Sequence, residues 1–434
     1  MIPSARDRLD ACLARIADPA GEGGRAFTKV WADSARAAAE AADLRARQGR
    51  SLGPLDGRIV SVKDLFDIPG EVTTAGSVLL RDAAPATAMA PAIARLQAAG
   101  AVLVGRTNMT EFAFSGVGIN PHYGTPGNPA DRSRIPGGSS SGGAVSVADG
   151  MAEIAIGSDT GGSTRIPAAL CGIVGWKPSQ SRVPTAGAFP LSYALDSIGP
   201  MARTVADCAL ADAVMAGIPP AVPAPAPLAG LRLGIPRGAL LEGLDEAVAA
   251  AFGAALQVLG TAGLQPGDVP LTDLLAEMAA VNGRGGFAAT EAFFIHRAWI
   301  DSRAAEFDPL VRGRIERGRA VTAADYIYMQ RRRRDLIAAM DGLLADLDAL
   351  VLPTTPIQAP AIAALAASEP AFTAANTALL RNTAVGNFFD LCAISLPLPA
   401  QGGLPVGLML MARNGQDARL LRIAAAIEAL FAGK

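Results

Sequence analysis

The chain has 434 residues, of which 50% are apolar and 18% are charged, so it can bury a large core, and extended disorder is excluded. Its net charge of −2 argues against a nucleic-acid partner and against an anionic membrane surface. The sequence has two histidines, His122 and His296, and neither sits among ligand-spaced neighbours, so we expect no metal site.

The start of the chain, residues 1–6, lacks the apolar segment of a signal peptide, and no stretch reaches the roughly 18 apolar residues of a membrane span. We therefore expect a soluble, cytoplasmic protein. Its four cysteines lack CxxC spacing and are expected to be reduced thiols in the core. They are Cys12, Cys171, Cys208 and Cys392.

In the first part of the chain, helical spacing of alanine and leucine alternates with short β-branched runs. These patterns predict helices over residues 4–17, 27–48 and 91–98, strands over 57–64 and 101–104, and a further helix opening within 105–113. The first strand leads into Lys63 and Asp64 at its end. Alternating strands and helices are typical of a sheet covered by helices.

Two glycine-serine clusters, residues 137–143 and 161–163, dominate the middle of the chain. A short helical run and the apolar run 153–157 separate them. Glycines beside a serine let the backbone turn sharply and let its N–H groups face a ligand. A phosphate-binding loop would need a lysine after the glycines, and neither cluster has one. The clusters therefore favour serine chemistry over nucleotide binding.

The second part of the chain begins with two helices and a proline-alanine linker and is then mainly helical until strands return near its end. We predict helices over 166–171 and 205–216, a linker over 219–227, a strand over 231–235, a mainly helical region over 245–347, strands over 349–353, 387–396 and 404–411, and a last helix over 418–430. The arginine run 331–334 is interpreted as a solvated helix face.

A serine hydroxyl is a poor nucleophile until a base takes its proton, and histidine is the usual base. Both histidines are interpreted as structural, so a Ser-His-Asp triad has little support. Lysine can replace histidine if it is held neutral, since only roughly one lysine in a few thousand is neutral at pH 7 without such help. Lys63, at the end of a strand, is well placed for this role.

Several separate blocks, in the same order, resemble the amidase signature enzymes. They are Ser-Val-Lys-Asp at 61–64, Gly-Arg-Thr-Asn-Met-Thr-Glu-Phe-Ala at 105–113, Pro-Gly-Gly-Ser-Ser-Ser-Gly-Gly at 136–143, Gly-Ser-Asp-Thr-Gly-Gly-Ser-Thr-Arg-Ile-Pro-Ala at 157–168, Gly-Trp-Lys-Pro at 175–178, and residues 403–407 with Glu428 near the end. The resemblance covers roughly residues 55–430. Arg106 stands where family members often carry lysine, and a structural role is expected for it.

The resemblance implies a role for each matched residue. Ser163 is the expected nucleophile, Ser139 the bridging serine after a cis Gly138–Ser139 bond, and Lys63 the base. The backbone N–H groups of Thr160, Gly161, Gly162 and Ser163 are expected to form an oxyanion hole. Loop support is expected from Gly138, Ser140, Asp159 and Arg165, the last two as an ion pair. Phe112, Phe189 and Tyr193 are expected in the acyl pocket or the core.

The implied fold is a single α/β domain over residues 1–434, with a mixed, mostly parallel central sheet flanked by helices. Within it we expect a signature core over 55–217, a helical half over 231–347 that selects the substrate and contains Tyr326 and Tyr328, and closing strands and a helix over 349–434. A homodimer is left open.

The resemblance implies that the chain cleaves a linear amide, a small-molecule substrate, through a Ser163 acyl-enzyme and that it needs no cofactor. Three alternatives remain. They are the glutaminase subunit of a tRNA-dependent amidotransferase, which needs companion subunits, a hydrolase of urea derivatives such as biuret or allophanate, which the segment 387–393 resembles, and a non-catalytic scaffold relative.

Overall fold

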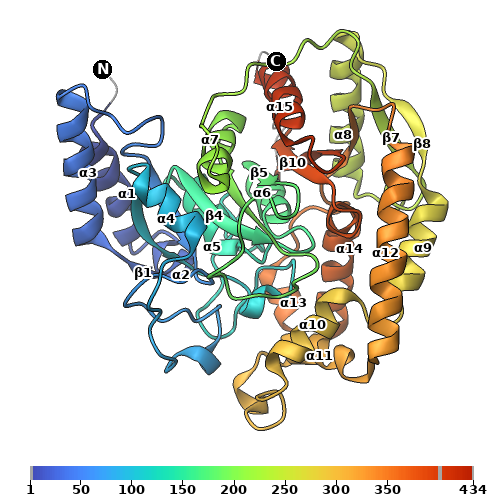
Figure 1. Cartoon of the computed structure of the whole chain (residues 1–434), viewed down its shortest axis with the longest axis horizontal. Coiled ribbons are helices and arrows are strands. Elements are labelled where there is room, and N and C mark those ends of the chain that lie inside the picture. Colours follow the sequence, from blue (N-terminus) through green and yellow to red (C-terminus); the bar gives the residue numbers. More distant parts are fainter. Residues whose placement is uncertain (1–2, 399–402, 433–434) are drawn as a thin grey trace.

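A mixed sheet of 11 strands runs through the molecule with helices on both faces (Figure 1). The computed structural model describes residues 3–398 and 403–432. The other residues of the predicted domain, 1–2, 399–402 and 433–434, lie outside the described part. The strand order is β1-β3-β2-β4-β6-β5-β10-β11-β9-β7-β8. The strands are β1 (Phe27–Val30), β2 (Ile59–Lys63), β3 (Val102–Thr107), β4 (Ile154–Asp159), β5 (Val174–Lys177), β6 (Ser197–Ala202), β7 (Leu233–Arg237), β8 (Gly267–Pro270), β9 (Ala349–Pro353), β10 (Cys392–Pro397) and β11 (Gly407–Ala412).

Helices pack in rows on the two faces of this sheet. Along one face α4, α7, α15 and α8 contact one another in sequence, and α5, α6 and α14 form such a row elsewhere in the fold. The helices are α1 (Ala5–Ala17), α2 (Gly23–Ala26), α3 (Ala32–Arg47), α4 (Pro91–Ala98), α5 (Ser141–Ala148), α6 (Arg165–Cys171), α7 (Val205–Ala216), α8 (Glu246–Thr261), α9 (Thr272–Asn282), α10 (Phe287–His296), α11 (Pro309–Glu316), α12 (Ala323–Leu343), α13 (Ile362–Ala366), α14 (Glu369–Phe388) and α15 (Asp417–Ala432). Short 3₁₀ helices are η1 (Val78–Leu80), η2 (Glu111–Ala113), η3 (Ala304–Glu306) and η4 (Arg317–Ala320).

Strand β2 shows how the sheet separates two cores. Val60 and Val62 join the apolar cluster that includes α4 and α7, whereas Ile59 joins the cluster with α1, α3 and α5. The split follows from the period of two along a strand, which sends alternate side chains to opposite faces. Ser61 shares the second face, where its hydroxyl lies 2.9 Å from that of Ser146 on α5.

The predicted single α/β domain with a mixed sheet is confirmed, but the expectation that parallel pairs dominate is wrong. Within residues 3–398 and 403–432, six of the ten strand pairings are antiparallel. A parallel pair needs a crossover connection, and α4 and α8 supply one between β2 and β3 and between β7 and β8. Strand β6 instead lies between β4 and β5 and runs antiparallel to both.

Most predicted elements are present, and the differences have local causes. The helices predicted over 91–98 and 205–216 match α4 and α7. The helix predicted over 27–48 begins only at Ala32, because residues 27–30 form β1 and pair with β3. Residues 105–107 continue β3 rather than opening a helix, and a side chain at Gly105 would lie 2.4 Å from the Lys29 carbonyl of β1. The helix α14 extends through Phe388 into the strand predicted over 387–396.

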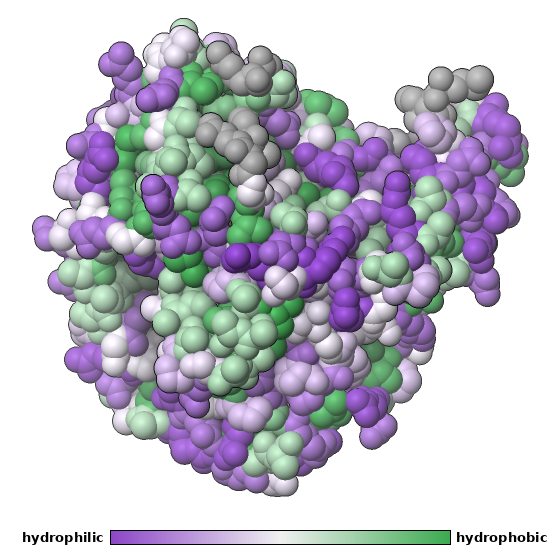
Figure 2. Space-filling model, turned by 180° about the vertical axis from the view of Figure 1, so that it is seen from behind, coloured by the Kyte–Doolittle hydropathy of each residue, from purple (hydrophilic) through white to green (hydrophobic). Residues whose placement is uncertain are grey.

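The buried cysteines match the expectation from the sequence, whereas the arginine run on α12 does not. Seen from behind, the molecule mixes hydrophilic and hydrophobic residues over its surface (Figure 2). All four cysteines are buried and unpaired. The arginine run on α12 is not fully solvated, since Arg333 donates hydrogen bonds to the carbonyls of Phe388 and Asn387 at 2.8 and 3.1 Å. In the part of the chain that the structure describes, no helix has the length and apolar character needed to cross a bilayer.

Candidate active site

Lys63 is a fully buried lysine at the end of the central strand β2. Its Nζ donates hydrogen bonds to the hydroxyls of Ser139, at 2.8 Å, and Ser158, at 2.9 Å. Burial lowers the pKa of Lys63 to about 7, although the carboxylates of Asp159 and Asp196 act in the opposite direction. A large fraction of this amine is therefore neutral near pH 7, and a neutral amine can accept a proton from a hydroxyl.

Ser139 lies in the loop before α5, directly after a cis peptide bond between Gly138 and Ser139. Two backbone hydrogen bonds fix this loop. The Gly138 N–H donates to the Gly116 carbonyl at 2.8 Å, and the Thr110 N–H donates to the Ser139 carbonyl at 3.0 Å. The Ser139 side chain is completely buried. Its hydroxyl is thus held next to the lysine.

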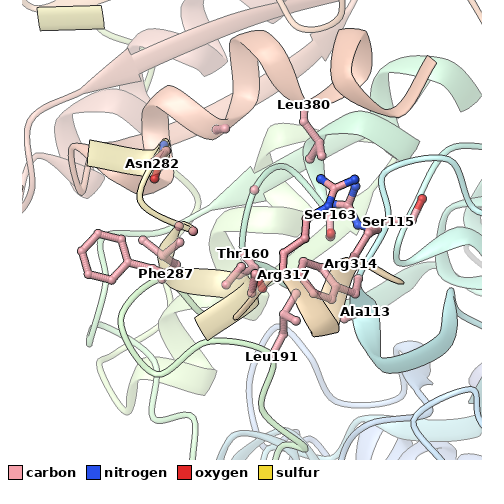
Figure 3. A pocket seen from close by; sticks show the side chains of 18 residues that line it. Ala113, Ser115, Thr160, Ser163, Leu191, Asn282, Phe287, Arg314, Arg317 and Leu380 are labelled. Carbon is pink, nitrogen blue, oxygen red and sulfur yellow. The ribbon is translucent and has the colours of Figure 1, made fainter. Parts of the chain in front are cut away.

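Ser163 lies in the loop between β4 and α6 and lines a cavity of about 280 Å³ (Figure 3). The Ser140 N–H donates to the Ser163 carbonyl at 3.3 Å, which ties this loop to the one that carries Ser139. Among the described residues, the Ser163 hydroxyl makes no hydrogen bond, either to Ser139 or to another group. The structure therefore joins Lys63 to Ser139 directly, and joins Ser139 to Ser163 through neighbouring backbone.

The loop 160–163 contains backbone N–H groups that form no hydrogen bond with the described part of the protein. Within the described ranges, the N–H groups of Gly161, Gly162 and Ser163 donate no hydrogen bond. The Thr383 hydroxyl on α14 donates to the Gly161 carbonyl at 2.6 Å and so holds the loop from its other side. Backbone N–H groups without partners in the fold can stabilise a negatively charged oxygen.

Gly162 is required by the conformation of this loop. Its φ is 137°, and a Cβ there would lie 2.2 Å from the Thr383 hydroxyl oxygen. We predict that Gly162→Ala lowers the free energy of unfolding by about 1–3 kcal/mol, because the backbone is strained and the threonine must move. Gly253→Ala is the matched control, since Gly253 lies inside α8 with open space around it and should gain about 0.5–1 kcal/mol. Urea unfolding of both variants tests this; equal stability changes would contradict it.

Below the loop, Asp159 and Arg165 form a fully buried ion pair, with Nη2 and Oδ1 2.9 Å apart. Burial alone would raise the pKa of Asp159, but the Arg165 charge and hydrogen bonds hold it well below its usual range. Asn387 on α14 completes the network, because its Nδ2 donates to Asp159 Oδ1 at 2.9 Å and its Oδ1 accepts from Arg165 Nη2 at 2.8 Å. The network anchors the end of β4 to the start of α6.

Sequence patterns do not identify three contributing residues: Ser158, Asp196 and Asn387. Asp196 accepts a 2.6 Å hydrogen bond from the Thr160 hydroxyl and further bonds from the Leu191 and Ser192 N–H groups. Burial raises the pKa of Asp196 to about 6. Ser158 stands inside a matched block and Asn387 opens the segment 387–393 noted above, but neither pattern predicts a contact in the site, and no local pattern marks Asp196.

The remaining candidate residues do not line the cavity that contains Ser163. His122 hydrogen-bonds with Glu111 at 2.9 Å, and His296 packs on Phe112 with ring centroids 4.2 Å apart. Neither histidine lines the cavity, and neither do Phe112, Phe189 and Tyr193. Its apolar walls come from other side chains, namely Phe114, Leu191, Leu195, Phe287 and Leu380. Arg106 is buried and pairs with Asp64 at 3.0 Å.

Residues of the predicted helical half reach this cavity, but its two tyrosines do not line it. The Tyr326 hydroxyl pairs with Glu291, and the Tyr328 ring lies under Arg284. Elsewhere in the described residues, no cluster of three or more histidine, cysteine, aspartate or glutamate side chains is arranged for a metal ion.

Comparison with known proteins gives consistent results. The family model described as Amidase matches residues 7–421. The 2-amino-5-chloromuconic acid deaminase of Comamonas testosteroni is 40% identical over 93% of this chain and 88% of its own length. A glutamyl-tRNA(Gln) amidotransferase subunit from Chloroflexus aurantiacus is 38% identical over 98% of this chain and 93% of its own. An inhibitor-bound structure, solved to trace the origins of an s-triazine catabolic enzyme, superposes with a TM-score of 0.88 at 34% identity, covering 98% of this chain and 95% of that one.

Proposed function

Because the chain belongs to the amidase family, whose members hydrolyse amide C–N bonds, we propose that it cleaves a linear amide through an acyl-enzyme on Ser163. The observation that carries the proposal is the buried Lys63 amine, 2.8 Å from the Ser139 hydroxyl and beside the loop of Ser163. An amine that is neutral near pH 7 is a competent general base. The products are a carboxylate and ammonia or an amine.

In the first step, Ser163 Oγ attacks the amide carbonyl carbon. Its proton passes to Ser139 Oγ while the Ser139 proton passes to Lys63 Nζ. Ser158 orients the amine by accepting its other hydrogen bond at 2.9 Å. The relay requires the Ser163 hydroxyl to bond to Ser139 once substrate is bound, and such bonds often tighten only in the substrate complex.

The negative charge that develops on the carbonyl oxygen is received by the N–H groups of the loop 160–163. One donor in such a site is worth about 2.7–4 kcal/mol of transition-state stabilisation. Collapse of the intermediate breaks the C–N bond, and the relay returns a proton to the departing nitrogen. Water, deprotonated along the same route, then hydrolyses the Ser163 ester and releases the carboxylate.

Hydrolysis by the isolated chain tests the proposal. A panel of linear amides, ureas and anilides is incubated with the chain, and ammonia or amine is measured together with carboxylate. We expect equal amounts of the two products from at least one linear amide and none with Ser163→Ala. Release that persists in Ser163→Ala would overturn the proposal.

A second candidate is the glutaminase subunit of a tRNA-dependent amidotransferase, because a relative named as part of such an enzyme matches 98% of this chain. That function requires companion subunits. Glutamine hydrolysis that appears only after those subunits are added, with no activity of the chain alone on the amide panel, would favour this candidate. The urea-derivative alternative is favoured by a relative named 1-carboxybiuret hydrolase subunit AtzE, from Pseudomonas sp. (strain ADP), which is 38% identical over 83% of this chain. Ammonia release from biuret or allophanate, with no hydrolysis of the linear amides in the panel, would favour this candidate.

The pH dependence follows from the Lys63 pKa of about 7. The base must be neutral, and its neutral fraction falls about tenfold for each pH unit below the pKa. We therefore predict that kcat/KM rises with pH up to about 7 and is level above about pH 8. Steady-state kinetics between pH 5 and about pH 9 check this, and a profile that is flat through pH 7 would contradict it.

A further inference from the structure

Two arginines line the cavity that contains Ser163. Arg314 comes from α11 and Arg317 from the start of η4, and Figure 3 shows both around the same space as Ser163 and Thr160. No aspartate or glutamate is among the described residues that line it. The cavity is therefore positively charged where the substrate must bind.

The Arg314 guanidinium has no polar partner among the residues that the structure describes. In residues 3–398 and 403–432 it forms no ion pair, and its Nε is buried without a hydrogen bond. Its one evident contact is the Phe114 ring, 4.8 Å away. Two neighbouring arginines behave differently, since Arg312 pairs with Glu316 at 2.9 Å and Arg319 pairs with Asp301 at 2.6 Å. Arg317 likewise forms no ion pair in the described residues, so both arginines that line the cavity differ from these two neighbours.

The charge of Arg314 persists at neutral pH. Burial, and then the charge of Arg317, lower the pKa of Arg314 to about 10. A sheltered cation without a counter-ion is unfavourable, and a second cation beside it adds repulsion. An anion placed between the two guanidinium groups would offset the cost of sheltering the Arg314 charge and the repulsion between the two arginines. Arginine forms such contacts with carboxylates through paired hydrogen bonds.

The start of α10 adds to the same positive field. Gly286 is the N-cap residue, with no side-chain cap, and Phe287, Ala288 and Ala289 of the first turn line the cavity. The first N–H groups of a helix lack intrahelical partners and favour negative charge nearby. Three positive groups from different elements therefore converge on one space.

We propose that Arg314 and Arg317 bind a carboxylate of the substrate, so that the enzyme acts on the amide of a dicarboxylic acid. This inference rests on the proposed function, because it assumes that the amide end of the same molecule reaches Ser163. The apolar walls contact the chain between the two ends. The enzyme then prefers substrates that carry both an amide and a carboxylate over amides without a carboxylate.

Matched substrates test the proposal. Malonamate, succinamate and glutaramate each carry the carboxylate, and propanamide, butanamide and pentanamide replace it with a methyl group. From the strength of charged hydrogen bonds, we expect kcat/KM for the best acid to exceed that of its neutral counterpart by roughly 10- to 100-fold. Arg314→Met and Arg317→Met should each reduce this ratio mainly through KM. Arg319→Met, a surface control that pairs with Asp301, should leave it unchanged.

A binding measurement separates this inference from the proposed function. Calorimetry with the Ser163→Ala variant compares malonate, succinate and glutarate with their neutral diamides. Binding of an acid that is lost in Ser163→Ala/Arg314→Met supports the carboxylate site even if none of the amides is hydrolysed. Hydrolysis of neutral amides as fast as acid amides, or equal binding of acids and diamides, overturns the carboxylate site and leaves the Ser163 chemistry intact.

Discussion

Replacing Ser163 by alanine is expected to lower kcat by about 10⁴-fold or more, because no other group can form the acyl-enzyme. Ser163 lines the cavity, beside a loop whose N–H groups are free. The substitution removes one oxygen from a side chain without hydrogen bonds, so the melting temperature should change little. Initial rates on the best amide of the panel, with circular dichroism to verify folding, provide the measurement.

Ser141→Ala is the matched control for this substitution. Ser141 lies at the start of α5, two residues after Ser139, and its hydroxyl is buried without a hydrogen bond. Its removal should leave kcat within about threefold of the parent, because a hydroxyl without partners contributes little to the fold. Comparable losses in the two variants would mean that serine substitution damages this region in general, and the nucleophile assignment would fail.

Replacing Lys63 by methionine is expected to lower kcat/KM by about 10⁴-fold, close to the effect of losing the nucleophile, since residues that act as one unit are not additive. Methionine fills the buried site with an apolar chain of similar length. Lys63→Arg should be equally inactive, because a guanidinium cannot give up its proton at neutral pH. Substantial activity in the arginine variant would show that the position supplies charge rather than a base.

Lys177 offers a matched control for burial of a lysine. It is also fully buried, and its Nζ donates to the carbonyls of Pro178 and Leu391, each at 2.9 Å. Burial lowers its pKa too, but it makes no hydrogen bond to a serine of the site in the described part of the chain. Lys177→Met should therefore lower the melting temperature while the pH profile of kcat/KM keeps its midpoint.

The residues proposed to be catalytic could be located in the sequence because they lie inside short blocks with distinctive spacing. Lys63 follows a β-branched strand, and Ser139 and Ser163 lie in glycine-rich loops on either side of α5 and β4. Local patterns of this kind also predicted α4 and α7. Ser158 lay inside one of these blocks, yet its contact with Lys63 depends on how β4 continues beside β2.

Other parts of the site depend on contacts that no local pattern encodes. Asn387 meets Asp159 across 228 positions of the chain, and only the packing of α14 over the β4 loop brings them together. The cavity walls were mispredicted for the same reason. Aromatic residues near the motifs pack elsewhere, whereas Arg314 and Arg317 reach the cavity from a helical region without recognisable motifs. The parallel bias expected for the sheet failed because strand order cannot be read from strand and helix alternation alone.

The central claim is that a neutral Lys63 activates Ser163 through Ser139. Its most direct test is the rate at which a fluorophosphonate modifies the protein between pH 5 and about pH 9, with the modified residue located by mass spectrometry. We predict modification at Ser163, a rate that rises about tenfold per pH unit and levels off near pH 7, and loss of at least about 10³-fold in Lys63→Met. Modification of a different residue, or an unchanged rate at Ser163 in Lys63→Met, would contradict the claim.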